Sequence, residues 1–450
     1  MIFLVIARHK VPKQSPCGEV SHSQNRDCFA SLAMTAAKGM VMTKKTSNKI
    51  IATILVLILL ALFGISAYML ANLAKRDKIY IKKDKEAYQL IADGKPLLIK
   101  GVCYSPVPPG ESHLYNWWGD PRQPWMLDGE LMKEMGINTI RVYEPGGNPE
   151  QVKRVIIDLY KNFGIRTILG HSVGFWEYPY ANYADAELQM RIKKEVYNMV
   201  KTYKDTPGIL AWVLGNEINY SFDGKINPWS APSIDKLPSV YDRKTARAKI
   251  YYTFVNDLAK IMKKVDPTRP VGFGNGELGT IEIAKECCLD LDFVGIIIYR
   301  GKSFGPLFRQ LKEKFGKPCI MIEFGCDSYN AATQKPDENN QALFLKQLWT
   351  EIKNNTYMGK GEKNCLGATI FEWSDEWWKY QTDTPSTWQM HNTEASWSNG
   401  SYYFDIAAPG GMNMNEEWFG LVSFSDEKDE NGLNKRVPKK AYSVLKKMWK

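Results

Sequence analysis

From Leu97 onward the chain alternates short apolar runs with longer amphipathic stretches. Runs such as ILAWVL at 209–214 and CIMI at 319–322 are apolar at every position, which is typical of parallel strands buried on both faces. The stretches between them place apolar residues at helical spacing, and one ends at Gly136. Strands are therefore expected at 97–102, 138–144, 166–171, 208–217, 269–276, 292–300, 319–325 and 367–373, and helices at 149–162, 186–203, 246–265, 307–315, 340–353 and 439–450, with one more ending at Gly136.

Eight such strand and helix units over roughly 375 residues predict an α/β fold of the (β/α)8 or TIM barrel type with long loops. A hairpin turning at Asp93–Gly94 is expected to lead into its first strand. The alternative, a doubly wound open sheet, lacks a phosphate-binding glycine turn after its first strand, and the nearest approach is GNGELG at 274–279.

A second pattern precedes this domain, because residues 50–74 carry no charge and are dominated by Ile, Leu, Val and Ala. A helix of that length reaches about 37 Å, enough for a hydrocarbon core of about 30 Å. We therefore expect a single transmembrane helix, since a cleaved signal peptide has an apolar section of only about 7–15 residues. The expected organisation is an N-terminal segment (1–49), the anchor (50–74), a charged linker (75–85) and the barrel domain (86–450).

The side of the membrane on which the barrel lies does not follow from charge alone. Lysines flank both ends of residues 50–74, and a simple count places the barrel in the cytoplasm. A basic N-terminal flank is also typical of an export anchor, and long domains translocate despite flanking charge. Residues 1–41 have little periodicity and include RDCFASLAMT, which resembles translated repeat DNA, so a start at Met40 or Met42 is the expectation.

Composition narrows the functional classes. With 44% hydrophobic and 24% charged residues, the chain is of ordinary globular composition. The net charge of +10 comes almost entirely from residues 1–95, which hold 15 Lys and Arg against 6 Asp and Glu; the remaining 44 basic and 43 acidic residues nearly cancel. Nothing therefore predicts a nucleic-acid partner. None of the eight cysteines has the spacing of a metal site, so neither metal nor cofactor is expected, and their disulfide state stays open.

In a TIM barrel the chemistry lies where the strands end, so the polar residues at these positions carry the prediction. Two of them are glutamates, Glu217 after the fourth strand and Glu323 after the seventh. Two carboxylates across a barrel mouth suit glycoside cleavage, in which one protonates the leaving oxygen while the other attacks the anomeric carbon or activates water. The complete set at the strand ends is Tyr104, Arg141, His171, Asn216, Glu217, Asn275 or Glu277, Tyr299, Glu323 and Trp373.

These residues resemble the clan A glycoside hydrolases over essentially residues 86–450, most closely the β-galactosidase and β-glucuronidase family and the β-1,3-glucanosyltransferases. LGNE at 214–217, IEFG at 322–325 and RVY at 141–143 carry the resemblance, together with DGKPLLIKGV and GINTIRVY. It implies a retaining β-glycosidase with Glu217 as acid/base and Glu323 as nucleophile. It also implies that Arg141 and Tyr299 orient Glu323, that Asn216 binds the sugar hydroxyl at carbon two, and that Trp373 lies under the sugar.

Several points stay open beside this resemblance. For His171, sugar binding and a structural place in the wall are equally expected, and for Arg141 the alternative is a structural ion pair. Ile297 stands where many relatives have Asn or His. All 14 tryptophans lie beyond residue 116, several of them in predicted mouth loops, and the long segment 374–425 is expected to form a lid or subsite wall.

The predicted function is therefore a membrane-anchored retaining β-glycosidase acting on a β-linked oligo- or polysaccharide, with the barrel outside the cytoplasm because the substrate is a glycan. A transglycosylase with the same two glutamates, and an inactive glycan-binding envelope protein, are the alternatives. The sequence does not give the sugar, its linkage or the oligomeric state.

Overall fold

The computed structural model describes residues 51–64, 78–379, 381–394, 397–398 and 412–450. The chain divides into two compact units, Met1–Lys75 and Arg76–Lys450. In the first unit residues 51–64 are helical, while the rest of the predicted anchor, 65–74, lies outside the described residues, as do residues 1–50. Among the described helices, none combines the length and the hydropathy that crossing a bilayer requires.

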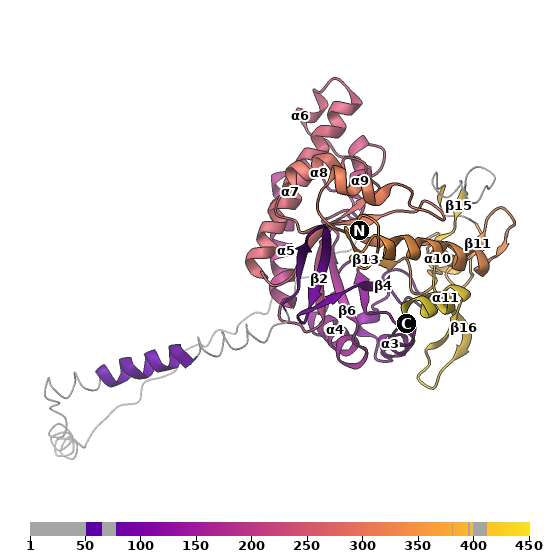
Figure 1. The fold of residues 1–450 in the computed structure, drawn as a ribbon, viewed down its shortest axis with the longest axis horizontal. Helices are drawn as coiled ribbons and strands as arrows, with labels where there is room; N and C mark the ends of the chain where they lie inside the picture. Colours follow the sequence, from indigo (N-terminus) through magenta and orange to yellow (C-terminus); the bar gives the residue numbers. More distant parts are fainter. Residues whose placement is uncertain (1–50, 65–77, 380, 395–396, 399–411) are drawn as a thin grey trace, which may run out of the picture. The chain divides into compact units, whose positions relative to one another are not determined.

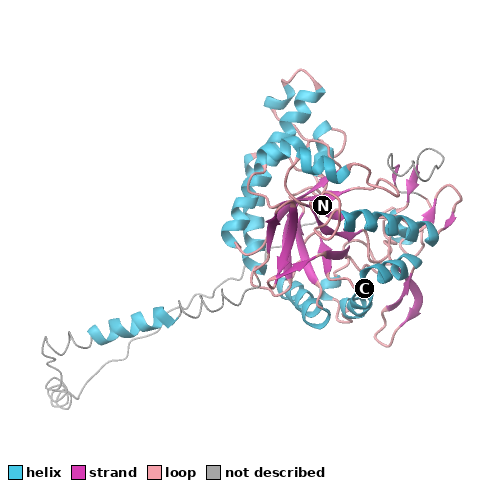
Figure 2. Ribbon diagram, in the orientation of Figure 1, coloured by secondary structure: helices cyan, strands magenta, loops and turns pink. Residues whose placement is uncertain are grey.

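The second unit is a closed barrel of eight parallel strands surrounded by helices (Figures 1 and 2), which confirms the predicted (β/α)8 architecture. Neighbouring strands follow the order β10–β13–β4–β5–β6–β7–β8–β9 around the barrel. Their bounds are β4 (Ile99–Cys103), β5 (Thr139–Val142), β6 (Arg166–His171), β7 (Ile209–Leu214), β8 (Val271–Gly276), β9 (Phe293–Ile297), β10 (Cys319–Glu323) and β13 (Cys365–Ile370).

The helices that follow these strands cover the outside of the barrel. They are α3 (Pro124–Met135), α4 (Pro149–Phe163), α5 (Ala186–Tyr203), the short α6 (Pro232–Asp235), α7 (Val240–Val265), α8 (Ile281–Cys287), α9 (Leu307–Lys314), α10 (Glu338–Asn354) and α11 (Lys440–Trp449). Local sequence sets their limits. In α4, for example, the side chain of Asn148 accepts a hydrogen bond from the backbone N–H of Glu150, Pro149 takes the first helical position, and Gly164 ends the helix at φ 73°.

The core has an outer and an inner part. The largest cluster of buried apolar side chains fills the space between the strands and the helices, and it reaches α11, whose Trp449 packs edge-on against Trp349. A second cluster contains Ile168 and Ile320 from the barrel strands together with Leu90. Leu90 belongs to a three-stranded antiparallel sheet, β1 (Tyr80–Asp84), β2 (Ala87–Ala92) and β3 (Lys95–Leu97), which therefore closes the end of the barrel where the strands begin.

This small sheet changes one prediction and confirms another. The hairpin at Asp93–Gly94 is present as the turn between β2 and β3. The segment expected to be a charged linker, 75–85, instead contains β1, which pairs with β2 along its whole length. Lys82 and Lys83 gave β1 the composition of a linker, but lysines on an outer strand are also how proteins protect a sheet edge.

The long connection after β13 holds only short elements in its described part. They are η3 (Pro385–Thr387), the strand pair β14 (Trp397–Ser398) and β15 (Met412–Met414), and η6 (Glu416–Trp418). The chain then returns to the end of β13, where Val422 forms a parallel bridge with Ser374. From there β16 (Val422–Lys428) and β17 (Asn434–Pro438) form a hairpin that leads into α11. A further small hairpin, β11 (Tyr329–Asn330) with β12 (Lys335–Pro336), follows β10.

Candidate active site at the carboxyl ends of the strands

The carboxylate of Glu323, the last residue of β10, is held by three donors. Nη1 of Arg141 lies 2.6 Å from Oε1, and the hydroxyl of Tyr143 donates to the same oxygen at 2.7 Å. The hydroxyl of Tyr299 donates to Oε2 at 2.9 Å. Both oxygens are therefore fixed in direction, and an ion pair with a guanidinium that is itself buried is among the stronger charge-assisted contacts in a protein.

Arg141 joins this group to the end of β7. It is 1% exposed, and besides Glu323 its guanidinium donates from Nη2 to Oδ1 of Asn216 at 2.6 Å. The amide oxygen of Asn216 is thus occupied, while its amide nitrogen donates no hydrogen bond to the described residues. Arg141 therefore orients a carboxylate and an amide at once, as only a planar, multiply donating side chain can do.

A further pair of contacts secures the strand end beneath Glu323. The thiol of Cys103 donates to the carbonyl of Ile322 at 3.3 Å, and the hydroxyl of Thr369 donates to the same carbonyl at 2.6 Å. Burial raises the pKa of the Cys103 thiol to about 12. The thiol therefore stays protonated at neutral pH and acts as a donor, not as a nucleophile.

Glu217 lies directly after Asn216 in a different electrostatic environment. It has a left-handed backbone with φ 57° and caps the short helix η2 (Ile218–Asp223). Burial raises the pKa of its carboxyl well above the usual range, and the negative charges of Glu323 and then Glu416 raise it further. At neutral pH this carboxyl is therefore expected to hold a proton, as a general acid must.

A second group of charges comes from the segment after β13 and was not foreseen. Nζ of Lys379 lies 2.7 Å from Oε2 of Glu416 and 3.4 Å from Oε2 of Glu376. Glu372 is 2% exposed, and its Oε1 accepts no hydrogen bond from the described residues. Burial, and after it the charge of Glu376, raises the pKa of Glu372 well above its usual range; burial raises the pKa of Glu376 to about 7.

The position of His171 favours a place in the barrel wall. Its Nδ1 accepts a hydrogen bond from the backbone N–H of Val173 at 3.0 Å, and its Nε2 lies 3.9 Å from Oε2 of Glu195. Burial lowers its pKa, so the imidazole is neutral at pH 7 with the proton on Nε2. Among the described residues, its ring contacts Val173, which follows β6, and Glu195 of α5.

The remaining polar residues at the strand ends are each held by a partner other than Glu323. Oδ1 of Asn275 accepts a hydrogen bond from the hydroxyl of Tyr252 at 2.7 Å, and Glu277 forms an ion pair with Arg300. The hydroxyl of Tyr104 donates to Asp128 at 2.9 Å.

The expected place of Trp373 under the sugar needs correction. Its side chain is completely buried in the large outer core, and its ring lies 6.4 Å from that of Tyr442 in α11. No face of the indole is open to a ligand. The aromatic ring from this strand end that packs beside the site is Phe371, whose centroid lies 6.3 Å from that of Tyr299.

Tyr143 is the residue beside Glu323 that strand-end reasoning missed. It lies two positions beyond Arg141, just past the end of β5, and successive side chains of an extended segment point to opposite sides. The alternation that directs Arg141 into the barrel therefore also directs Tyr143 toward the mouth. The motif RVY at 141–143 therefore carries a signal for Tyr143 as well as for Arg141.

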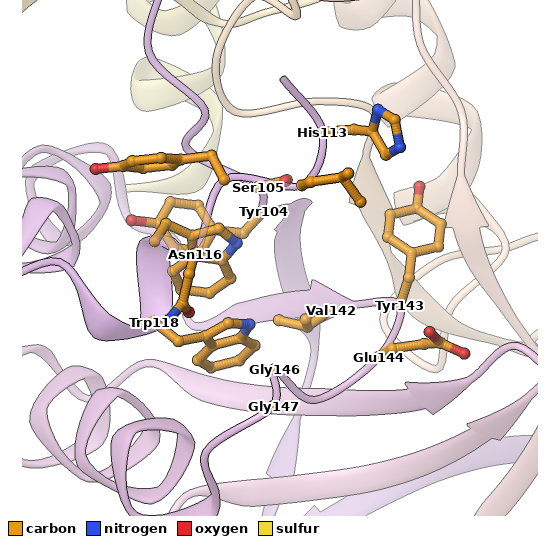
Figure 3. Close-up of a pocket in the computed structure, with 13 residues that line it drawn as sticks. Tyr104, Ser105, His113, Asn116, Trp118, Val142, Tyr143, Glu144, Gly146 and Gly147 are labelled. Atoms are coloured by element: carbon orange, nitrogen blue, oxygen red, sulfur yellow. The ribbon is translucent and has the colours of Figure 1, made fainter. Parts of the chain in front are cut away.

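A cavity of about 470 Å³ opens beside Tyr143 (Figure 3). It lies between the loop after β4 and the loop after β5. Its lining residues are Tyr104, Ser105, His113, Leu114, Tyr115, Asn116, Trp117, Trp118, Val142, Tyr143, Glu144, Gly146 and Gly147. A smaller cavity of about 100 Å³ lies beside η2 and is lined by Asn219, Tyr220, Asp223, Lys244, Gly276, Glu277 and Gly279.

The tryptophans that follow the strand ends, whether in loops or in α3, differ in exposure. Trp125 is fully buried, whereas Trp176 is 66% exposed. In the segment after β13, the ring of His391 stacks between two indoles, with centroids 3.5 Å from Trp418 and 4.7 Å from Trp377. These three half-buried rings therefore pack on one another and join distant parts of the segment.

Comparison with known proteins identifies relatives of this barrel. The family model described as "Glycosyl hydrolases family 2, TIM barrel domain" matches residues 85–350. A β-galacturonidase from Eisenbergiella tayi bound to galacturonate is 18% identical, with a TM-score of 0.51, over 83% of this chain and 54% of its own. A β-glucuronidase from Bacteroides uniformis is 16% identical, with a TM-score of 0.52, over 83% of this chain and 37% of its own.

At these identities the likeness concerns the fold, and this chain spans about half or less of the length of either neighbour. A search of curated proteins finds no match.

Proposed function

The chain belongs to glycosyl hydrolases family 2, and on that premise we propose that it cleaves β-linked oligo- or polysaccharides with retention of configuration at the anomeric carbon. The membership agrees with the resemblance to the β-galactosidase and β-glucuronidase family. The observation that carries the proposal is the contrast between two carboxyls at one barrel mouth. Glu323 is fixed by three donors, while burial and negative charge raise the pKa of Glu217. Opposed environments of this kind separate a nucleophile from an acid.

In the first step, an oxygen of Glu323 attacks the anomeric carbon and forms an ester with the sugar. The bond to the leaving oxygen breaks, and that oxygen takes the proton of Glu217. Arg141, Tyr143 and Tyr299 keep the attacking carboxylate in position, so little reorganisation is needed as the bond forms. The amide nitrogen of Asn216 is available to donate to a sugar hydroxyl.

The second step follows from the charge coupling between the two glutamates. Once Glu323 is esterified it has no negative charge, and one cause of the raised pKa of Glu217 disappears. The Glu217 carboxylate then accepts a proton from water, whose oxygen attacks the anomeric carbon and breaks the ester to Glu323. The sugar leaves with its original configuration, and both carboxyls return to their starting states.

For the cellular location, we propose a single-pass anchor at residues 50–74 with the barrel outside the cytoplasm. Support comes from the uncharged sequence and from the helix at 51–64, whose apolar side chains, such as Leu59 and Phe63, are exposed. Protease treatment of intact spheroplasts tests this orientation. Loss of the barrel domain is the expected result, and its protection would contradict it.

The test of the activity compares the full chain with its Glu323→Gln variant on 4-nitrophenyl β-glucoside, β-galactoside, β-glucuronide and β-galacturonide. Proton NMR follows the anomer released first. We expect the wild type to release the β anomer from at least one of these and the variant to release none at a comparable rate. Release of the α anomer first, or equal turnover by both proteins, would contradict the proposal. Binding of glycans without turnover would favour the inactive glycan-binding alternative.

A further inference from the structure

The cavity of about 470 Å³ adjoins the proposed catalytic centre through one side chain. Tyr143 lines the cavity, and its hydroxyl donates a hydrogen bond to Oε1 of Glu323. In Figure 3 the Tyr143 ring stands at one side, with His113 above it, and Trp118 and Asn116 lie on the opposite side. A sugar bound at Glu323 would therefore lie next to this cavity.

The aromatic wall of this space is built rigidly. The indoles of Trp117 and Trp118 stack with centroids 3.9 Å apart, and Tyr104 packs edge-on against Trp117 at 5.2 Å. Gly146 permits this arrangement, because a Cβ there would lie 2.2 Å from Cδ1 of Trp118. The hydroxyl of Tyr104 is fixed by Asp128, which also pairs with Arg436. Preformed walls of this kind reduce the entropy lost on binding.

Three polar side chains of the cavity and part of a fourth, in contrast, have no hydrogen-bond partner among the described residues. Within the part of the chain that the structure describes, the side chains of Ser105, His113 and Asn116 make no hydrogen bond. Glu144 uses only Oε1, which accepts from the backbone N–H of Ser172 at 2.9 Å. Unused donors and acceptors beside flat aromatic faces suit a hexose, whose hydroxyls need partners and whose C–H faces pack on rings.

The position around the barrel indicates which part of a glycan the cavity receives. The leaving group must contact Glu217, which follows β7 and begins η2. The large cavity lies at the ends of β4 and β5, separated from β7 by β6. The smaller cavity beside η2 is on the side of Glu217. The large cavity is thus on the side of the sugar that stays bound to the enzyme after the first step.

We propose that this cavity binds a second hexose unit of a β-glycan, attached to the non-reducing side of the sugar held at Glu323. This inference rests on the proposed function and specifies its substrate. The enzyme then prefers to cleave within a chain, or to release disaccharides, instead of removing single terminal sugars.

The test compares 4-nitrophenyl glycosides of a β-linked disaccharide and of the matching monosaccharide, with cellobiose, laminaribiose and gentiobiose against glucose as the first set. With the full wild-type chain, kcat/KM for nitrophenol release is expected to be at least tenfold higher for one disaccharide. Gly147→Phe is chosen to narrow the cavity, because Gly147 lines it and a Cβ there meets no atom within 4 Å, so that a larger side chain is accommodated. In this variant, kcat/KM for the disaccharide is expected to fall to the value for the monosaccharide. For the monosaccharide, kcat/KM is expected to stay within twofold of the wild-type value.

Gly279→Phe is the matched control, since Gly279 has equally open surroundings but lines the smaller cavity. It is expected to keep the preference for the disaccharide. Asn116→Ala, which removes a donor without adding bulk, is expected to lower the same preference severalfold. Equal kcat/KM for mono- and disaccharides in the wild type, or an equal loss on both substrates in Gly147→Phe, would overturn the inference.

A binding measurement keeps the two proposals separate. The full-chain Glu323→Gln variant is titrated with glucose and the same three disaccharides, and tryptophan fluorescence is recorded. Tighter binding of a disaccharide that Gly147→Phe abolishes supports the subsite even if no substrate is turned over and the proposed function fails. Equal affinity for glucose and all disaccharides would overturn it independently of turnover.

Discussion

Arg141 and Glu323 form an ion pair, with Nη1 and Oε1 2.6 Å apart, between side chains that are 2% and 7% exposed. One belongs to β5 and the other to β10, and β13 and β4 lie between these strands in the barrel order. The pair therefore spans the barrel mouth. The carboxylate that we propose as the nucleophile therefore also takes part in a contact that holds two distant strand ends together.

Replacing Arg141 by lysine is expected to affect activity and stability together. The ammonium keeps the charge but cannot donate to Glu323 and Asn216 at once, so kcat is expected to fall at least a hundredfold. Loss of buried contacts is expected to lower the free energy of unfolding by about 3 kcal/mol. Steady-state kinetics and thermal denaturation measure the two effects. Arg191→Lys, at an exposed arginine that pairs with Glu195, serves as control and is expected to change neither appreciably.

Tyr143→Phe removes one of the three donors to Glu323 without changing the shape of the ring. A hydrogen bond to a charged group contributes about 1.5–3 kcal/mol, which corresponds to a fall in kcat of roughly tenfold to a hundredfold. KM is expected to change little, because the hydroxyl holds the nucleophile. Tyr88→Phe loses only a contact with the Gly316 carbonyl and is the control. A raised KM at unchanged kcat would show that Tyr143 binds substrate and does not position Glu323.

The raised pKa of Glu217 predicts the alkaline side of the pH profile. The first step needs this carboxyl protonated, so kcat/KM is expected to decline as pH rises through its raised pKa and to be retained at lower pH. Glu217→Gln cannot release a proton and is expected to lose about 10²- to 10⁴-fold in rate and to lack this decline. With a dinitrophenyl glycoside, whose leaving group needs little protonation, the fall in rate caused by Glu217→Gln is expected to be smaller. An unchanged alkaline limb in the variant would rule out Glu217 as the acid.

Trp373→Phe tests whether this tryptophan stabilises the core or binds the sugar. Because the indole is completely buried against the segment that carries Leu421 and Tyr442, we expect the variant to be less stable by about 1–3 kcal/mol. Its KM should match that of the wild type. A clear rise in KM with unchanged thermal stability would restore the sugar-binding role that the sequence predicts for this tryptophan.

The sequence predicts this barrel well because strands such as β7 and β10 contain continuous apolar runs and the longer helices have an amphipathic period. It also predicts Arg141, Glu217 and Glu323 as neighbours, since parallel strands end on one side of a barrel. What it does not predict depends on contacts between distant segments. Lys379 meets Glu416 only because the segment after β13 folds back on the mouth.

The sequence also does not predict the direction in which side chains point beyond the end of a strand. Trp373 follows β13 closely, yet it points into the outer core while Phe371 packs beside Tyr299. No periodicity gives this difference, because β13 ends at Ile370 and the strand alternation ends with it.

The most direct test of the two-carboxylate account is to trap the sugar on the enzyme. A 2-deoxy-2-fluoro β-glycoside with a dinitrophenyl leaving group, made from the sugar that the aryl glycoside panel selects, is incubated with the full chain. Intact mass and peptide mass spectrometry then locate the adduct. The account predicts one fluoroglycosyl group per chain, esterified to Glu323 and absent in Glu323→Gln. An adduct on another residue, or continued hydrolysis with no adduct, would contradict it.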